Sequence, residues 1–175
     1  VAVLGLRYNP ILALIALFMF FAAQAESSYE VQRAQASGHA ARDAMVSRFL
    51  SLSPSDTAQR AADLLIVSTQ QEFPVLDGHG RLRGWVTRQA LVDAMRDEGP
   101  GAVVSSFMLA DTEAVAEDTP LEEVLAKLQQ AQTGAVAVAG PQGGVRGFVN
   151  RENAAELFMI EQARGREGGA GGPVA

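Results

Sequence analysis

Two short stretches of the sequence decide the fold: Gly84-Trp-Val-Thr-Arg88 and Gly147-Phe-Val-Asn-Arg151. Gly147 follows Gly84 by 63 positions, and the same offset takes Met45 to Met108. Residues 41–160 therefore look like one unit of about 60 residues that occurs twice. Two copies are too few for an open array of repeats to bury a core. The sequence instead predicts a closed pair in which each half covers the other.

Both halves show the same order of expected elements, βαββα, so the predicted fold class is α/β. In the first half we expect strands at 49–52, 73–76 and 82–86 and helices at 57–68 and 88–97. In the second half we expect strands at 113–116, 135–139 and 145–149, a helix that starts near Thr119, and a helix at 151–163. Thr119-Pro-Leu-Glu122 has the pattern of a capping box, with Pro120 at the first helical position. The first long helix should bury one face, formed by Ala58, Ala61, Ala62 and Leu65.

The N-terminal residues 1–25 are almost wholly apolar, and PILALIALFMFFAA at 10–23 carries no charge. Fourteen helical residues reach about 21 Å, short of the ~30 Å hydrocarbon core, but the whole of 1–25 is long enough. A transmembrane helix is the leading interpretation. Ala23-Gln-Ala25 also fits a signal-peptide cleavage site, and a buried soluble helix is a third alternative. Arg33 and Arg42 after the segment favour a cytoplasmic side for the remainder of the chain.

Composition excludes several classes of function. The net charge is −6 and no basic block occurs, which argues against a nucleic-acid partner. The sequence has no Cys, so disulfides, thiolate metal sites and Cys nucleophiles are excluded. His39 and His79 are too few and too far apart to make a zinc site by themselves, and neither HExxH nor GxSxG occurs. We therefore expect no catalytic residues and no metal ligands in this chain.

The repeated pattern resembles a tandem pair of cystathionine-β-synthase (CBS) domains, often called a Bateman module. Three stretches carry the resemblance: Arg42-Asp-Ala-Met45, FPVLDGHGRLRGWVTRQAL at 73–91, and AVAVAGPQGGVRGFVNRENA at 135–154. The resemblance implies two βαββα repeats packed as a pseudo-symmetric pair, at 41–97 and 104–163. Residues 26–40 would then be a linker, and the Gly-rich residues 164–175 a disordered tail.

A second resemblance concerns the part upstream of the repeats. NPILALIALFMFFAAQAE at 9–26, followed by a CBS pair, is similar to the last membrane segment and regulatory module of a site-2-protease-type zinc metalloprotease. This implies a C-terminal piece of a membrane protein whose zinc-binding part is absent from this chain. Membrane lipid would contact residues 1–25, and the CBS pair would lie in the cytoplasm.

CBS pairs resemble one another in binding adenosine-type nucleotides in clefts between the halves, so ATP, ADP or AMP is the expected ligand. Each cleft would contain a helix N-terminus, where free N–H groups and the helix dipole favour an anion. The candidate residues are Thr87 and Arg88 in the first half, and Asn150, Arg151 and Asn153 in the second. Val75, Ala135 and Ala137 would leave room for a flat base.

Two departures from the family pattern weaken this expectation. The family has Thr/Ser-x-x-Asp, whose Asp accepts hydrogen bonds from the ribose hydroxyls. Here the matching positions are Ala90, which cannot accept, and Asn153, which has no charge. Thr87 and Asn150 also fit simple helix caps, and the two arginines fit solvated surface charges. If one cleft binds, we expect it to be the cleft of Asn150, Arg151 and Asn153.

The leading functional hypothesis is a regulatory binding module on a membrane anchor. The alternative is a CBS dimerisation module that binds no ligand, either membrane-anchored or secreted. CBS pairs also resemble one another in forming flat dimers, so a homodimer is the expected assembly.

Overall fold

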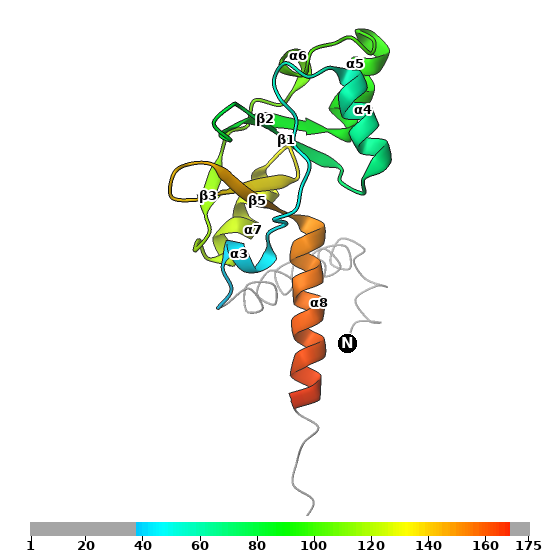
Figure 1. The fold of residues 1–175 in the computed structure, drawn as a ribbon. Coiled ribbons are helices and arrows are strands. Elements are labelled where there is room, and N and C mark those ends of the chain that lie inside the picture. The colour runs from blue at the N-terminus through cyan, green and yellow to red at the C-terminus, as the bar shows by residue number, and fades with distance from the viewer. Residues whose placement is uncertain (1–37, 169–175) are drawn as a thin grey trace, which may run out of the picture. The chain divides into compact units, whose positions relative to one another are not determined.

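The computed structural model describes residues 38–168 (Figure 1). The predicted membrane helix at 1–25 and most of the predicted linker at 26–40 lie outside the described residues. Within residues 38–168, no helix combines the length and the apolar character that crossing a membrane requires.

The first repeat contains helix α4 (Ala58–Val67), strands β1 (Glu72–Leu76) and β2 (Leu82–Thr87), and helix α5 (Arg88–Asp97). β1 and β2 form an antiparallel two-stranded sheet. The strand expected at 49–52 is not formed; only Leu52 makes a parallel bridge, to Val75. Leu52 exchanges two backbone hydrogen bonds with Pro74 and Leu76, so the segment keeps the position of a strand but only one residue pairs.

The second repeat contains the full βαββα order. It runs through β3 (Ala114–Ala116), α7 (Leu121–Gln130), β4 (Ala135–Ala139), β5 (Val145–Asn150) and α8 (Arg151–Gly168). β3 pairs with β4 in parallel, and β4 pairs with β5 in antiparallel orientation. The prediction of an α/β fold built from two related halves is confirmed.

Two short helices cross from one repeat to the other. α3 (Ala41–Ala44) begins the first repeat in sequence but packs on the second, where the amide of Ala41 donates to the carbonyl of Thr119 at 2.9 Å. α6 (Val104–Phe107) begins the second repeat in sequence but packs on the first, where the amide of Val104 donates to the carbonyl of Asp56 at 2.8 Å. Each half is therefore completed by a segment that belongs to the other half in sequence.

The repeated glycines are explained by these crossings. Directly after α3, Val46 forms a bridge with Phe148 of β5, and directly after α6, Leu109 forms a bridge with Trp85 of β2. A Cβ atom at Gly147 would lie 2.5 Å from the carbonyl oxygen of Val46. A Cβ atom at Gly84 would lie 2.5 Å from the carbonyl oxygen of Leu109. Glycine is required at both positions because another backbone passes directly over it.

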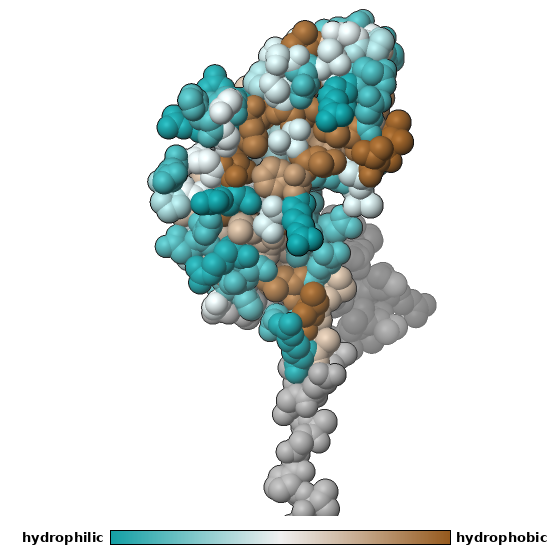
Figure 2. Space-filling view, viewed as in Figure 1, coloured by the Kyte–Doolittle hydropathy of each residue, from teal (hydrophilic) through white to brown (hydrophobic). Residues whose placement is uncertain are grey.

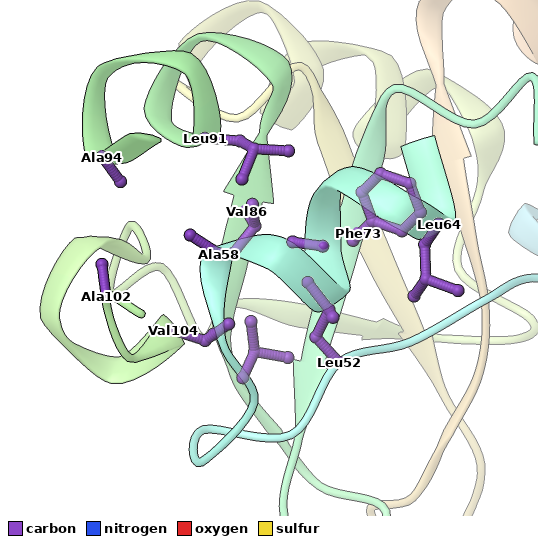
Figure 3. Packing of buried hydrophobic residues seen from close by; sticks show 11 residues of the cluster. Leu52, Ala58, Leu64, Phe73, Val86, Leu91, Ala94, Ala102 and Val104 are labelled. Atoms are coloured by element: carbon purple, nitrogen blue, oxygen red, sulfur yellow. The ribbon is translucent and has the colours of Figure 1, made fainter. Parts of the chain in front are cut away.

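The core of the first repeat lies between α4, α5, α6 and the inner face of the β1–β2 sheet (Figure 3). Phe73, Val86 and Val104 are completely or almost completely buried there. The buried face of α4 differs from the prediction at two positions. Ala58, Ala61 and Leu64 are buried. Ala62 and Leu65, which were expected on this face, are only partly buried. Leu64 reaches the core because i, i+3 and i+6 remain on one face over two helical turns.

A second hydrophobic cluster joins the two repeats. Its buried members are Leu82, Trp85, Ala135, Ala137 and Phe148. The ring of Phe148 makes edge-to-face contacts with Trp85, at a centroid distance of 5.7 Å, and with Phe49, at 5.8 Å. The closed pair expected from the repeat is thus held by aromatic packing across its centre.

Two predicted boundaries are wrong. α7 begins at Leu121, and Pro120 is its N-cap residue with a non-helical ψ of 134°, so Pro120 is not the first helical residue. α8 continues to Gly168, so residues 164–168 are helical and do not belong to a Gly-rich tail. The glycines at 165 and 168 suggested an earlier end from composition alone.

Candidate functional site

A cavity of about 920 Å³ lies beside the N-terminus of α8. Three segments provide most of its lining: residues after α3 within 46–50, the loop 68–72 between α4 and β1, and residues of 148–156 at the β5–α8 junction. The first two segments belong to the first repeat and the third to the second. The cavity is therefore a cleft between the repeats, and its size is in the range of a small-molecule site.

Asn150, Arg151 and Asn153 all line this cavity. Asn150 ends β5, and its Oδ1 accepts a hydrogen bond of 2.9 Å from the amide of Asn153, so the predicted helix cap is formed. Nη2 of Arg151 donates to the carbonyl oxygen of Leu128 at 3.3 Å, near the C-terminus of α7. The structure brings these three residues together, and their role in binding stays a prediction.

Thr87 and Arg88 are placed differently. Thr87 ends β2 and its Oγ1 accepts from the amide of Ala90 at 3.2 Å, which makes it the N-cap of α5. The amide of Arg88 donates to the carbonyl of Gln71 at 3.2 Å. Neither residue lines the large cavity. The two halves are thus symmetric in their backbone but not in the space beside their helix caps.

A smaller cavity of about 250 Å³ lies in the counterpart region, near the C-terminus of α7. Asp111, Glu113 and Lys127 are among its lining residues, and Thr87 and Arg88 are not. Lys127 and Glu113 form a salt bridge in its wall, and this hydrogen bond raises the pKa of Lys127 above its usual value. This salt bridge pairs the one cation of the lining with Glu113, and Asp111 is the remaining charged lining residue.

The apolar part of the large cavity comes from Val46, Phe49, Leu50 and Phe148. Sequence reasoning instead placed Val75, Ala135 and Ala137 beside the base, and this expectation is wrong for the large cavity. Val75 and Ala137 are fully buried in the two hydrophobic clusters, and Ala135 lines the smaller cavity. The reason is that β1 and β4 are covered on both faces, so their small side chains face packed atoms.

Five charged side chains line the large cavity: Arg48, Glu72, Arg151, Glu152 and Glu156. Glu72 begins β1 and is half-buried. Desolvation by burial raises the pKa of its carboxyl group, and the nearby charge of Glu152 acts in the same direction. A hydrogen bond from the Asn150 side chain opposes the shift without cancelling it. Sequence reasoning missed Glu72 and Arg48, because both residues belong to the first repeat and reach α8 only through the packing of the two repeats.

No group of three or more residues that could hold a metal ion occurs within the described part of the chain. Nor does any buried side-chain nitrogen or oxygen there lack a hydrogen-bond partner.

Comparison with known proteins identifies the family to which the two repeats are similar. The family model described as "CBS domain" matches residues 41–97 and again residues 104–159. A search of curated proteins finds no match.

Solved structures of CBS pairs are similar to this chain at low sequence identity. The CBS domain pair of protein MJ0100, solved in complex with 5′-methylthioadenosine and S-adenosyl-L-methionine, is 22% identical, with a TM-score of 0.63 over 70% of this chain and 98% of that one. CBSX2 in complex with AMP is 23% identical, with a TM-score of 0.63 over 71% of this chain and 99% of that one. A putative acetoin utilization protein (AcuB) from Vibrio cholerae is 18% identical, with a TM-score of 0.66 over 74% and 96%. At these identities the likeness shows the fold, and the repeated match to the family model shows that the chain belongs to the CBS domain family as a tandem pair.

Proposed function

We propose that the CBS pair is a regulatory module that binds an adenosine-type ligand in the cleft beside Asn150. The observation that carries the proposal is the cavity of about 920 Å³ between the repeats, which combines an aromatic wall with a helix N-terminus and charged groups. The wall includes Phe49 and Phe148, which can pack against a flat base. Two similar CBS structures were solved with adenosine-type compounds, which supports the choice of ligand class.

The cleft also explains how binding would be transmitted. Its lining comes from both repeats, so a ligand in it contacts the segment after α3, the loop before β1 and the first turn of α8 at once. A ligand that binds one arrangement of the repeats more tightly than another shifts the population toward that arrangement. The long helix α8, which leaves the cleft at Asn150 and extends to Gly168, would carry the shift to whatever lies beyond it (Figure 1).

Isothermal titration calorimetry of the full chain tests the proposal. The four titrants are adenosine, AMP, ATP and S-adenosylmethionine. Thr69→Trp fills the cleft from an exposed loop position that lines it, and we expect it to abolish the heat of binding. Thr112→Trp is the matched control, because Thr112 is also exposed and lines neither cavity. Absence of heat with all four compounds, or equal binding by both tryptophan variants, would contradict the proposal.

We also propose that residues 1–25 anchor this module to a membrane, with the CBS pair in the cytoplasm, as part of a site-2-protease-type zinc metalloprotease. The support is the apolar sequence at 9–26 followed by the CBS pair, and these residues lie outside the described part of the structure. Extraction of the expressed chain from membranes tests the anchor. Release by carbonate or salt without detergent would contradict it.

A second candidate function is an interaction module that binds no ligand. Ile66 and Val67 at the end of α4 are 80% and 77% exposed, and the hydropathy of the surface shows an apolar area over this helix (Figure 2). Exposed large aliphatic side chains of this kind are typical of contact surfaces. Homodimerisation through such a surface stays a prediction, and sedimentation of the chain with Ile66→Ser and Val67→Ser, compared with the unchanged chain, measures it.

A further inference from the structure

The charges in the large cavity separate two kinds of adenosine-type ligand. Three of the lining side chains are carboxylates, Glu72, Glu152 and Glu156, and two are arginines, Arg48 and Arg151. A nucleotide places a phosphate with one or more negative charges in the cleft, whereas a nucleoside does not. The arrangement of these five groups therefore decides which one the cleft accepts.

The helix N-terminus, which would ordinarily attract a phosphate, already has an anion. Glu152 lies in the first turn of α8, and Glu156 follows four residues later on the same side of the helix. The dipole of α8 thus favours the carboxylate of Glu152 and leaves less attraction for a ligand anion. Glu152 and Glu156 are both exposed, so water and salt screen their repulsion of a phosphate as they screen the attraction of an exposed arginine, and Glu72 is the lining charge that is least screened.

The two arginines do not reverse this balance. The guanidinium of Arg151 donates to the carbonyl oxygen of Leu128 at 3.3 Å, so part of its hydrogen-bonding capacity is used within the protein. Arg48 is exposed to solvent at the rim of the cavity. Exposed charges are screened by water and salt, so Arg48 offers a ligand phosphate little net attraction.

Glu72 has a different environment from the other two carboxylates. It is half-buried, it comes from the first repeat, and it faces the Asn150 side chain of the second repeat. Burial raises the pKa of its carboxyl group, which shows that water solvates the charge poorly. A carboxylate in this position gains from hydrogen-bond donors and loses from a second anion. The two vicinal hydroxyls of a ribose are donors of the right kind, because a carboxylate can accept from both.

We propose that the cleft selects a ribonucleoside without a phosphate, uncharged or cationic at its 5′ position, and that Glu72 accepts the hydrogen bonds of its ribose hydroxyls. The proposal rests on the proposed function, because it takes an adenosine-type ligand in this cleft as given. Asn153 stands where the family pattern has Asp, and in this arrangement Glu72 supplies the negative charge instead. The carboxylate comes from the opposite repeat.

The test is calorimetric titration of the full chain with four probes: adenosine, AMP, 5′-amino-5′-deoxyadenosine and 2′,3′-dideoxyadenosine. We expect adenosine and the 5′-amino compound to bind at least about tenfold more tightly than AMP, with a larger ratio at low salt. We expect 2′,3′-dideoxyadenosine to bind about tenfold more weakly than adenosine, because the Glu72 carboxylate then loses both donors.

Glu72→Gln removes the charge and keeps the shape. This variant should bind adenosine more weakly and AMP more tightly, so the preference for adenosine over AMP falls by about tenfold or more. Glu98→Gln is the matched control, because Glu98 is exposed, lines neither cavity and carries the same charge. It should leave all four affinities unchanged.

The outcomes distinguish this inference from the function on which it rests. The selection of a nucleoside over a nucleotide would be overturned if the unchanged chain bound AMP more tightly than adenosine. It would also be overturned if Glu72→Gln kept the same preference for adenosine over AMP. Either result would leave an adenosine site in place. If adenosine and 2′,3′-dideoxyadenosine bound equally well, Glu72 would not accept hydrogen bonds from the ribose hydroxyls. This comparison uses the unchanged chain and requires no variant. Absence of binding with every probe would overturn the adenosine site itself.

Discussion

The close approach of backbone to Gly147 makes Gly147→Ala a sharp test of how the repeats are joined. The added Cβ would lie 2.5 Å from the carbonyl oxygen of Val46 and 3.2 Å from the sulfur of Met45. An unstrained carbon–oxygen contact is about 3.3 Å or longer, so the two backbones must separate by about 0.8 Å. The carbonyl of Val46 cannot move away by a simple rotamer change, because it belongs to the main chain.

The separation acts on two hydrogen bonds between the repeats. The amide of Val46 donates to the carbonyl of Phe148 at 2.8 Å, and the amide of Phe148 donates to the carbonyl of Val46 at 3.2 Å. Losing both costs about 1 kcal/mol each, and overpacking of this kind costs about 1–3 kcal/mol more. We therefore expect Gly147→Ala to lower the free energy of unfolding by about 3–5 kcal/mol, a large fraction of the stability of a small domain.

Urea unfolding of the full chain, followed by tryptophan fluorescence, measures this effect. Trp85 is the only tryptophan in the sequence, and its buried ring contacts Phe148 at the junction of the repeats. Gly84→Ala provides an internal comparison, because its Cβ would meet the carbonyl of Leu109 at the same 2.5 Å. The two variants should be destabilised to a similar extent.

Gly101→Ala is the control. A Cβ at Gly101 meets no atom within 4 Å and its φ angle is not positive, so the midpoint should stay unchanged or rise slightly. If Gly147→Ala unfolds at the same urea concentration as Gly101→Ala, the segment after α3 does not pass over β5 as described, and the reasoning is refuted.

Two further predictions concern the cleft. Asn150→Ala removes the acceptor of the Asn153 amide and should lower stability by about 1 kcal/mol in the same urea assay; a change equal to that of Gly101→Ala would show that the cap contributes nothing. Glu72→Gln should raise the melting temperature at pH 8 more than at pH 4: the pKa of Glu72 is raised in the folded chain, so its favourable contribution is present when it is protonated and is lost as the pH rises. A melting-temperature difference that is the same at both pH values would contradict this.

The cleft was predicted from sequence only in part. The caps of α5 and α8 were predictable, because Thr87 and Asn150 each directly follow a strand and precede a helical pattern, and both form the expected hydrogen bond. The preference for the second cleft over the first agrees with where the large cavity lies. Whether its residues bind a ligand stays a prediction.

The opposite wall of the cleft could not be predicted in the same way. Arg48 and Phe49 reach α8 only because the segment after α3 crosses to the second repeat, whereas Glu72 lines the cleft from the start of β1. No local pattern indicates such a crossing: a sequence of about 60 residues that occurs twice is compatible with each copy folding on its own segment. The contacts of α3 and α6 show that each of these helices packs on the other repeat.

The sequence by itself determined the element order, because hydrophobic periodicity, turn residues and helix caps act over a few residues. It also determined that the halves are equivalent, through the 63-residue offset that relates Gly84 to Gly147. Only the tertiary structure decided why both positions must be glycine, which half has the large cavity, and which carboxylate faces Asn150. The physical reason is that these three features depend on which distant backbone lies against each strand, and that choice is made by packing of the whole pair.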